Sequence, residues 1–403
     1  MRLFVTGMCV AVLVAAGGAV AQERNCKVLS QSITFHARPH PDFTLPVRLG
    51  GAPAHLLQID TGSTGIVVGY MHVGKTPAQR PLTKAELGQL GLQEYIVYSS
   101  SGNVRMGHWV YTSLELLNGT QPAFVDHIPV LAVDKLCKAK PGQLTEPFDC
   151  SASPKLPVDC QNAAKGSPAM DLCNLGMMGV GFDRGTSMGT SAVNPFLHLR
   201  QMEAHTMQRG YVITIGRGVT LGMTPPEIAG FRFLPLAPNP KAPGEWLEAH
   251  GCIAITGGGI VEPGKQVCGD ILMDTGVDTM FVSYGPGLLP AFNPPIPGSG
   301  GNLWTCVNTC SVNGNAASAG VTVTWPGPGE PIFTYGVTPV PFRADGKNPT
   351  AVHVRNATSA LTNPSENVFV NTSRQLLYTA DYLFDASCGR IGFRPFQPSP
   401  RTK

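Results

Sequence analysis

The chain has little charge and lacks any long stretch with the periodicity of an amphipathic helix. Only 14% of its 403 residues are charged, whereas it holds 47 glycines and 36 prolines. Turn-forming residues at this density are typical of proteins built from many short strands. The composition therefore argues against a helical protein and predicts an all-β protein, long enough for two domains with cores of their own.

An excess of charge of one sign is also missing, because 29 basic residues face 26 acidic ones. This balance does not indicate a nucleic-acid partner. No C-x-x-C pair or His-x-x-x-His element accompanies the cysteines, so we expect no zinc site. His36 and His40 lie in a proline-broken segment, where we expect them to be solvated.

Apolar runs are short everywhere except at the N-terminus. Residues 1–21 combine Arg2, the apolar run from Leu3 to Ala16 and the cleavage-site pattern Ala19-Val20-Ala21, as in a secretory signal peptide. The run is too short to span a membrane. We therefore expect an exported protein, secreted or periplasmic, that starts near Gln22 and has no membrane association after cleavage.

Ten of the eleven cysteines lie beyond this signal, and an even number in an exported protein predicts disulfides. A polar insertion at 134–174 holds four of them, which predicts two internal disulfides of undetermined connectivity. We also expect Cys252 and Cys268 to bridge a hairpin, and Cys306 and Cys310 to close a small loop. The four cysteines of the insertion are Cys137, Cys150, Cys160 and Cys173.

One short motif occurs twice. Residues 56–68 read LLQIDTGSTGIVV and residues 271–283 read ILMDTGVDTMFVS, so Asp60-Thr61-Gly62 is repeated as Asp274-Thr275-Gly276 at an offset of 274 − 60 = 214 residues. Each copy predicts a strand that ends in a tight turn carrying a carboxylate. A buried acid is costly unless it is used or paired, so each motif is expected to supply the other's partner.

Two Asp-Thr-Gly turns in one chain resemble the pepsin-like aspartic proteases. The resemblance implies a bilobal all-β fold with a cleft between two β-barrel-like lobes, and an aspartic endopeptidase that uses no cofactor or metal. It makes Asp60 and Asp274 the catalytic pair, with Thr61, Gly62, Ser63, Thr275 and Gly276 in support. On chemical grounds, two adjacent carboxylates share one proton and can activate a water molecule at acid pH. Gly62 and Gly276 are expected to permit the turns.

The resemblance also assigns the remaining segments. Residues 22–205 form the N-terminal lobe, whose first strand is expected at Thr44–Leu49, residues 206–396 form the C-terminal lobe, and 397–403 form a tail. The alternating stretch Glu94 to Leu117 predicts a hairpin. It corresponds to the flap over the cleft, with Tyr98 and Ser99 contacting substrate and Tyr95 as the alternative tyrosine.

Two further strands and a disulfide follow from the same resemblance. Leu175 to Phe182 is expected to run beside the first catalytic loop, with Gly179 allowing close approach. Val368 to Phe393 is expected to form a strand, a short helix and a final hairpin. Because the termini of this family meet in one sheet, Cys26 and Cys388 are expected to pair.

This chain departs from the family pattern at three positions. Val277 replaces a serine or threonine, which should deprive Asp274 of a hydrogen bond, and Val67 replaces a tryptophan behind the flap. Asn371 stands where the second loop-flanking strand has glycine. A catalytically silent pepsin-fold protein that binds or inhibits a partner is therefore the alternative function.

Two other motifs are weaker indications of different functions. Gly185 to Gly189 fits the G-x-S-x-G elbow of serine hydrolases around Ser187, but Asp183 and Arg184 interrupt the strand that this elbow requires. Gly176 to Gly181 is glycine-rich without a following phosphate-binding helix. For the protease function, the expected partner is a polypeptide substrate in an extended conformation. The protein itself is expected to be a monomer.

Overall fold

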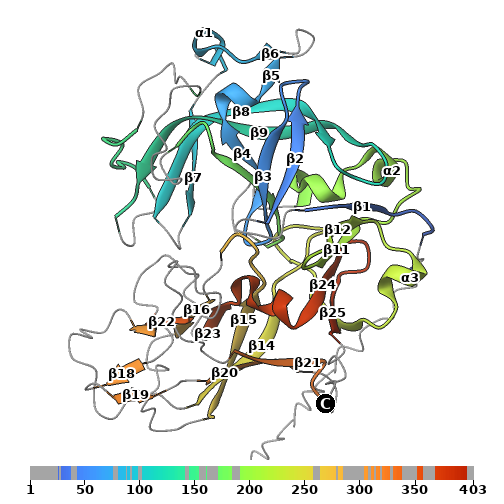
Figure 1. The fold of residues 1–403 in the computed structure, drawn as a ribbon, viewed down its shortest axis with the longest axis vertical. Coiled ribbons are helices and arrows are strands. Elements are labelled where there is room, and N and C mark those ends of the chain that lie inside the picture. Colours follow the sequence, from blue (N-terminus) through green and yellow to red (C-terminus); the bar gives the residue numbers. More distant parts are fainter. Residues whose placement is uncertain are drawn as a thin grey trace, which may run out of the picture.

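In the computed structural model three large β-sheets form most of the protein, as Figure 1 shows. An all-β architecture was expected from the composition, and this is confirmed. The structure describes Cys26, Cys160 and residues 29–37, 43–75, 80–87, 89–90, 93–98, 102–140, 145–153, 171–183, 191–256, 264–277, 280–284, 304–306, 310–312, 315–317, 320–326, 330–337, 352–356 and 368–396. The expected signal peptide, Ser99, His40 and Ser187 lie outside these residues.

The seven-stranded sheet belongs to the N-terminal half of the chain. Its order is β2-β3-β10-β4-β9-β8-β7, and β2 also pairs with β8. This extra pairing closes part of the sheet on itself and so leaves fewer free strand edges. The bounds are β2 Thr44–Leu49, β3 His55–Asp60, β4 Thr64–Gly69, β7 Glu94–Tyr98, β8 Asn103–Leu116, β9 Ala123–Lys138 and β10 Gly176–Val180.

The eight-stranded sheet belongs to the C-terminal half, at the bottom of Figure 1. Its order is β17-β22-β16-β23-β15-β14-β20-β21. The bounds are β14 Ala249–Thr256, β15 Gln266–Leu272, β16 Met280–Tyr284, β17 Trp304–Cys306, β20 Gly320–Trp325, β21 Phe333–Val337, β22 Val352–Asn356 and β23 Val368–Asn371.

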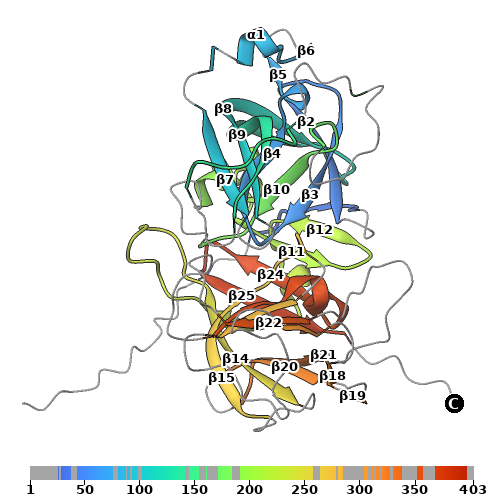
Figure 2. The ribbon, with the colours of Figure 1, turned by 90° about the vertical axis from the view of Figure 1, so that its left-hand side faces the viewer.

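The six-stranded sheet lies between these two and takes strands from both ends of the chain (Figure 2). Its order is β1-β12-β11-β24-β25-β13, with β1 Ile33–Phe35, β11 Gly210–Thr214, β12 Gly218–Leu221, β13 Arg232–Pro235, β24 Ala380–Asp385 and β25 Arg390–Pro395. Strand β1 precedes the first strand expected from sequence. Three residues are too few to show a period, so this strand depends on its partner β12.

The two halves repeat one strand arrangement around their Asp-Thr-Gly turns. Strand β10 lies between β3 and β4, parallel to the first and antiparallel to the second. Strand β23 lies between β15 and β16 with the same two orientations. Each turn is thus flanked by a strand from a distant part of its own half.

The helices that the structure describes are short. Residues 194–202 contain a 3₁₀ turn and the start of α2, separated by the extended residue Leu199. The bounds are α1 Lys84–Leu87, α2 Arg200–Glu203 and α3 Pro225–Ile228, with 3₁₀ helices at Tyr70–His72, Ser191–Val193, Pro195–Leu197 and Ser373–Tyr378. Two minor sheets pair β5 Gly74–Lys75 with β6 Arg80–Pro81, and β18 Cys310–Val312 with β19 Asn315–Ala317.

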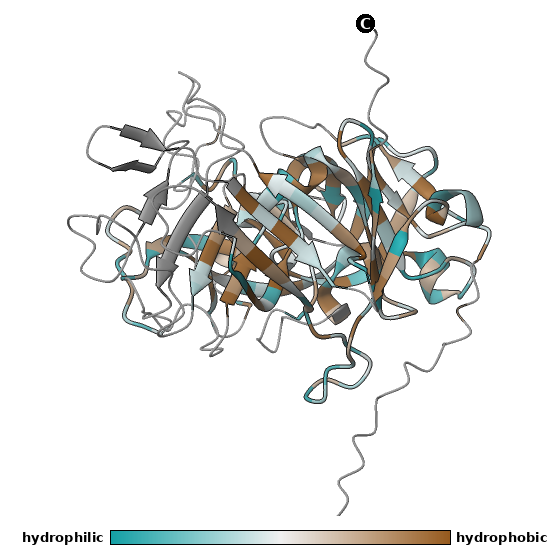
Figure 3. Ribbon diagram, turned by 90° about the horizontal axis from the view of Figure 1, so that it is seen from below, coloured by the Kyte–Doolittle hydropathy of each residue, from teal (hydrophilic) through white to brown (hydrophobic). Residues whose placement is uncertain are grey.

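Apolar side chains are concentrated along the strands, as the brown segments of Figure 3 show. One continuous buried cluster runs through all three large sheets. Trp325 of β20 packs against Phe393 of β25 with ring centroids 4.5 Å apart, which ties the eight-stranded sheet to the six-stranded one. The site described below is therefore supported from beneath by a shared core.

Four disulfides join cysteines within the described part of the chain. The insertion contains two sequential pairs, Cys137–Cys150 and Cys160–Cys173, and Cys252–Cys268 links β14 to β15 as expected. Strand β9 continues to Lys138 in register with β8, so residues 134–138 of the expected insertion, including Cys137, belong to the seven-stranded sheet. The Cys306 and Cys310 side chains lie outside the described part of the structure.

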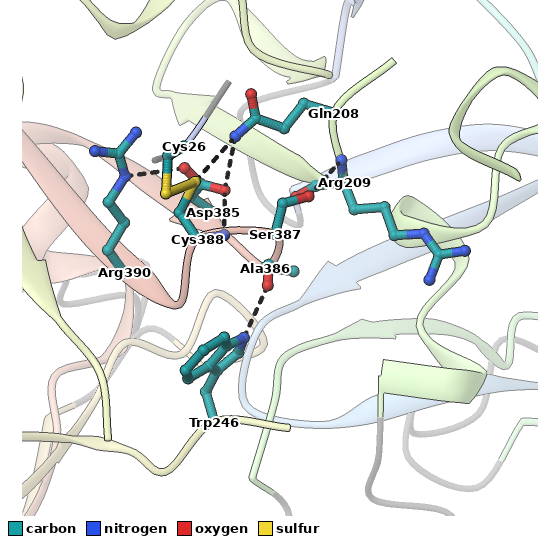
Figure 4. Close-up of a disulfide and its surroundings, with 9 residues drawn as sticks. All are labelled: Cys26, Gln208, Arg209, Trp246, Asp385, Ala386, Ser387, Cys388 and Arg390. Atoms are coloured by element: carbon teal, nitrogen blue, oxygen red, sulfur yellow. Dashed lines mark hydrogen bonds and ion pairs between the residues drawn. A yellow bond between two sulfur atoms is a disulfide. The ribbon is translucent and has the colours of Figure 1, made fainter. Parts of the chain in front are cut away.

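The fourth disulfide joins Cys26 to Cys388 across 362 residues and confirms the long-range pairing expected from the resemblance. Figure 4 shows its surroundings. The buried Asp385 carboxylate accepts hydrogen bonds from Gln208 Nε2 at 2.9 Å, Cys388 N at 3.0 Å and Arg390 Nε at 2.9 Å. The N-terminal segment is thus fixed to the hairpin between β24 and β25.

Candidate active site

The first Asp-Thr-Gly turn connects β3 to β4. Asp60, the last residue of β3, is 4% exposed. Its Oδ1 accepts a hydrogen bond from Gly62 N at 2.8 Å, and its Oδ2 accepts one from Ser63 Oγ at 2.5 Å. Aspartate commonly bonds the backbone two residues on in such turns. Both oxygens are held, and Ser63 supports Asp60 as expected.

Gly179 of β10 stands directly beside this turn, opposite Asp60 in the parallel register and Gly65 in the antiparallel one. A Cβ at this position would collide with the backbone of Thr64. The expected role of Gly179, close approach of two backbones, is confirmed. The same register shows Gly176 to Val180 as strand β10 rather than as a phosphate-binding loop.

The second turn follows β15 and carries Asp274, which is 7% exposed. Its Oδ1 accepts from Gly276 N at 2.8 Å, as in the first turn. Its Oδ2 accepts from Asn371 Nδ2 at 2.6 Å, and Asn371 Oδ1 in turn accepts from Ser373 N at 2.9 Å. The latter bond fixes which way the amide faces, so the NH₂ group points at the carboxylate.

Asn371 corrects the expectation that Asp274 lacks a second donor. At the offset of 214 residues Val277 corresponds to Ser63 and has no hydroxyl, but the asparagine supplies the missing hydrogen bond from another strand. Asn371 also does not occupy the place of Gly179. It pairs with Leu272, two residues before Asp274, and its side chain spans the remaining distance. The only sequence signal was a polar residue at the end of an apolar strand.

Two threonines join the turns through a reciprocal set of four hydrogen bonds. Thr61 Oγ1 donates to Met273 O at 2.7 Å and accepts from Thr275 N at 3.0 Å. Thr275 Oγ1 donates to Ile59 O at 2.7 Å and accepts from Thr61 N at 3.1 Å. Both side chains are buried, at 3% and 0% exposure. Because each hydroxyl bonds the backbone of the other turn, the two turns form one rigid unit.

Gly62 and Gly276 are required for a reason other than the one expected. Neither has the left-handed backbone that favours glycine. Instead, a Cβ at Gly62 would collide with the carboxyl group of Asp274, and a Cβ at Gly276 would collide with that of Asp60. Each carboxyl group therefore lies against the glycine of the opposite turn, and the absence of these side chains lets Asp60 and Asp274 meet.

The electrostatics of the pair follow from this contact. Burial raises the pKa of Asp274 well above its usual range, and the neighbouring charge of Asp60 and a hydrogen bond between the two carboxyl groups raise it further. The hydrogen bonds from Asn371 and Gly276 oppose this increase in pKa because they stabilise the ionised form. The geometry thus favours one proton shared by two carboxyl groups.

The expected hairpin is formed by β7 and β8, with Tyr98 paired to Asn103. Burial raises the pKa of the Tyr98 hydroxyl, and the charge of Asp60 raises it further, so this tyrosine lies within electrostatic reach of the pair. Tyr95 instead packs edge-on against Phe148 at 5.0 Å, on the other face of the hairpin. The sequence left open which tyrosine lies near the pair, and in the structure it is Tyr98 rather than Tyr95.

Val67 of β4, at the position where the resemblance led us to expect a tryptophan, is buried. It belongs to a small apolar cluster on the side of the hairpin that holds Ile96. Ile96, Trp109 and Met177 are partly buried against this cluster, so the hairpin is supported from below by aliphatic and aromatic packing.

Within the described residues, no three histidine, cysteine, aspartate or glutamate side chains come together as a possible metal site. His36 is exposed beside β1, away from the pair. Among the helices that the structure describes, none is long and apolar enough to cross a membrane. Comparison of the chain with models of known protein families and with curated proteins found no match.

Proposed function

We propose that the chain is an exported aspartic endopeptidase with a pepsin-like, two-lobe fold. The N-terminal lobe, 22–205, supplies Asp60 and the C-terminal lobe, 206–396, supplies Asp274. The observation that carries the proposal is the meeting of these two buried carboxyl groups, each held by a backbone N–H and a side-chain donor. The disulfides support export, because such bonds persist in oxidising compartments.

The chemistry needs only the pair and a water molecule. The two carboxyl groups share one proton, and the raised pKa of Asp274 reflects how strongly the pair holds it. The carboxylate without the proton takes one from the water as the water attacks the peptide carbonyl, and the carboxyl group with the proton donates it to the carbonyl oxygen. As the intermediate breaks down, the proton taken from the water passes to the leaving nitrogen and a hydroxyl of the intermediate returns a proton to the other carboxylate, which restores the pair. The apparent pKa values of activity belong to the pair as a unit.

The substrate binds as an extended strand between the pair and the hairpin of β7 and β8. Extended peptides add to exposed strand edges through backbone hydrogen bonds. Tyr98 lies within electrostatic reach of Asp60, which supports a role for it in covering the substrate. The rival proposal of a silent binding protein rested mainly on Val277, and the hydrogen bond from Asn371 removes that support.

The test is cleavage of a denatured protein between about pH 3 and pH 6, where a carboxyl pair holds one proton. We expect cleavage that is blocked by a statine-type peptide and abolished in Asp60→Asn and Asp274→Asn. Asp126→Asn is the matched control, because this exposed aspartate pairs with Arg200 on the surface. Cleavage that persists in both pair variants would refute the proposal.

A further inference from the structure

A buried arginine on the hairpin has no partner for its charge among the residues that the structure describes. Arg105 of β8 is 5% exposed, and its Nε and Nη1 atoms are both buried and make no hydrogen bond. Removing a guanidinium from water without pairing it costs several kcal/mol. No acid among the described residues forms an ion pair with it, so the fold as it stands leaves this cost uncompensated.

Two other partly buried arginines each donate a hydrogen bond to an aspartate. Arg390 Nε donates to Asp385 at 2.9 Å, and Arg394 Nε donates to Asp381 at 2.8 Å. Both side chains remain more accessible than Arg105, at 23% and 31% exposure. The most buried of the three arginines is therefore the one that lacks a carboxylate.

Arg105 lies on the face of the hairpin that also holds Tyr98. It lies opposite Ile96 of β7 and Leu136 of β9. Strand alternation puts it on the same face as Ile96 and Tyr98, whereas Val104 and Met106 pack on the other face. Figure 1 shows this hairpin extending from the N-terminal half toward the C-terminal half.

Tyr98 links this arginine to the catalytic pair. The hydroxyl of Tyr98 lies within electrostatic reach of both Arg105 and Asp60. Burial lowers the pKa of Arg105, and the neighbouring Tyr98 counteracts this. Tyr98 therefore lies within electrostatic reach of both the Arg105 cation and the carboxyl group of Asp60.

We propose that Arg105 binds an acidic side chain of the substrate close to the cleaved bond. This inference rests on the proposed function and adds a preference for glutamate or aspartate at one position of the peptide. A guanidinium donates charge-assisted hydrogen bonds to a carboxylate, and Nε and Nη1 of Arg105 have no acceptor among the described residues. Binding supplies the partner that the unliganded fold lacks.

The experiment uses a quenched fluorescent peptide that the protein cleaves, capped at both ends so that only side chains carry carboxylates. Glutamate and, in a matched series, glutamine replace each residue around the cleaved bond in turn, at about pH 6, where glutamate is ionised. At one position we expect kcat/KM to be roughly ten- to a hundred-fold higher for glutamate, the range for a hydrogen bond to a charged group.

Arg105→Gln should reduce this ratio to about one, and Arg105→Lys should retain part of it because the charge remains. Arg217→Gln is the control, since it removes the same charge from an exposed turn. No preference for glutamate at any position in the wild-type protein overturns the inference, and this result needs no variant. A preference that survives Arg105→Gln also overturns it.

A binding measurement separates this inference from the proposed function. Calorimetry with Asp60→Asn should show tighter binding of the glutamate peptide than of the glutamine peptide, with the difference lost when Arg105→Gln is added. That outcome supports the role of Arg105 even if no peptide is ever cleaved. Equal binding of both peptides counts against it even if cleavage is observed.

Discussion

The hydrogen bond from Asn371 to Asp274 makes a quantitative prediction about the pH dependence of activity. The amide stabilises the ionised carboxylate and so lowers its pKa against the upward effects of burial and Asp60. Replacing Asn371 with alanine removes this donor. Hydrogen bonds to charged groups contribute about 1.5–3 kcal/mol, and 1.36 kcal/mol corresponds to one pKa unit. The pKa for loss of the shared proton should therefore rise by about 1–2 units.

The assay is the pH profile of kcat/KM for a neutral peptide. Loss of the shared proton sets the alkaline limb, so this limb should move to higher pH in Asn371→Ala. The change also leaves Ser373 N without its acceptor, which should lower the free energy of unfolding by about 1–3 kcal/mol. Urea unfolding measured in parallel keeps the two effects apart.

A second substitution tests the cause. Val277 occupies the place that Ser63 has in the first turn, and valine and threonine have nearly the same shape. Adding Val277→Thr to Asn371→Ala offers Asp274 a hydroxyl in the position from which Ser63 bonds Asp60. The alkaline limb should then return toward its wild-type position. An alkaline limb that does not move in the folded Asn371→Ala protein, or moves to lower pH, refutes the reasoning.

The threonine bonds and the charge of the pair give two further predictions. Thr61→Ala removes the hydrogen bonds to Met273 O and from Thr275 N, so the free energy of unfolding measured in urea should fall by about 2–4 kcal/mol. Thr61→Ser retains the hydroxyl and both hydrogen bonds, so it should change this free energy little. An equal loss of stability in both variants would contradict the role of the hydroxyl. The raised pKa of Asp274 means that the native state binds a proton more tightly than the unfolded chain, so stability falls as pH rises above the unfolded value of about 4. Asp60→Asn removes the neighbouring charge and should therefore raise Tm at pH 7 but not at about pH 3; a lower Tm at pH 7 argues against the shared proton.

Local pattern was enough to predict several features of this fold. The apolar flanks of Asp60 and Asp274 defined strands ending in turns, and alternation over Glu94 to Leu117 defined the hairpin. Composition predicted an all-β protein, and the even number of cysteines predicted disulfides. These features depend on neighbours in sequence or on composition, so they are visible without knowing which strands lie side by side.

Pairings between distant strands decided the rest. Asn371 reaches Asp274 across 97 residues only because β23 lies between β15 and β16 and ends two residues short of the turn. Gly62 is needed because a carboxyl group 212 residues away lies against it, since 274 − 62 = 212.

The chain by itself determined which residue types stand at the two turns: two acids, two threonines and two glycines at one offset. Only the tertiary structure decided which atoms hold them, which tyrosine lies within electrostatic reach of Asp60, and that Arg105, within reach of the same tyrosine, is buried with no ion pair to a described residue. The physical reason is that hydrogen bonding and burial depend on the register of strands far apart in sequence, which the hydrophobic pattern of either strand alone does not encode.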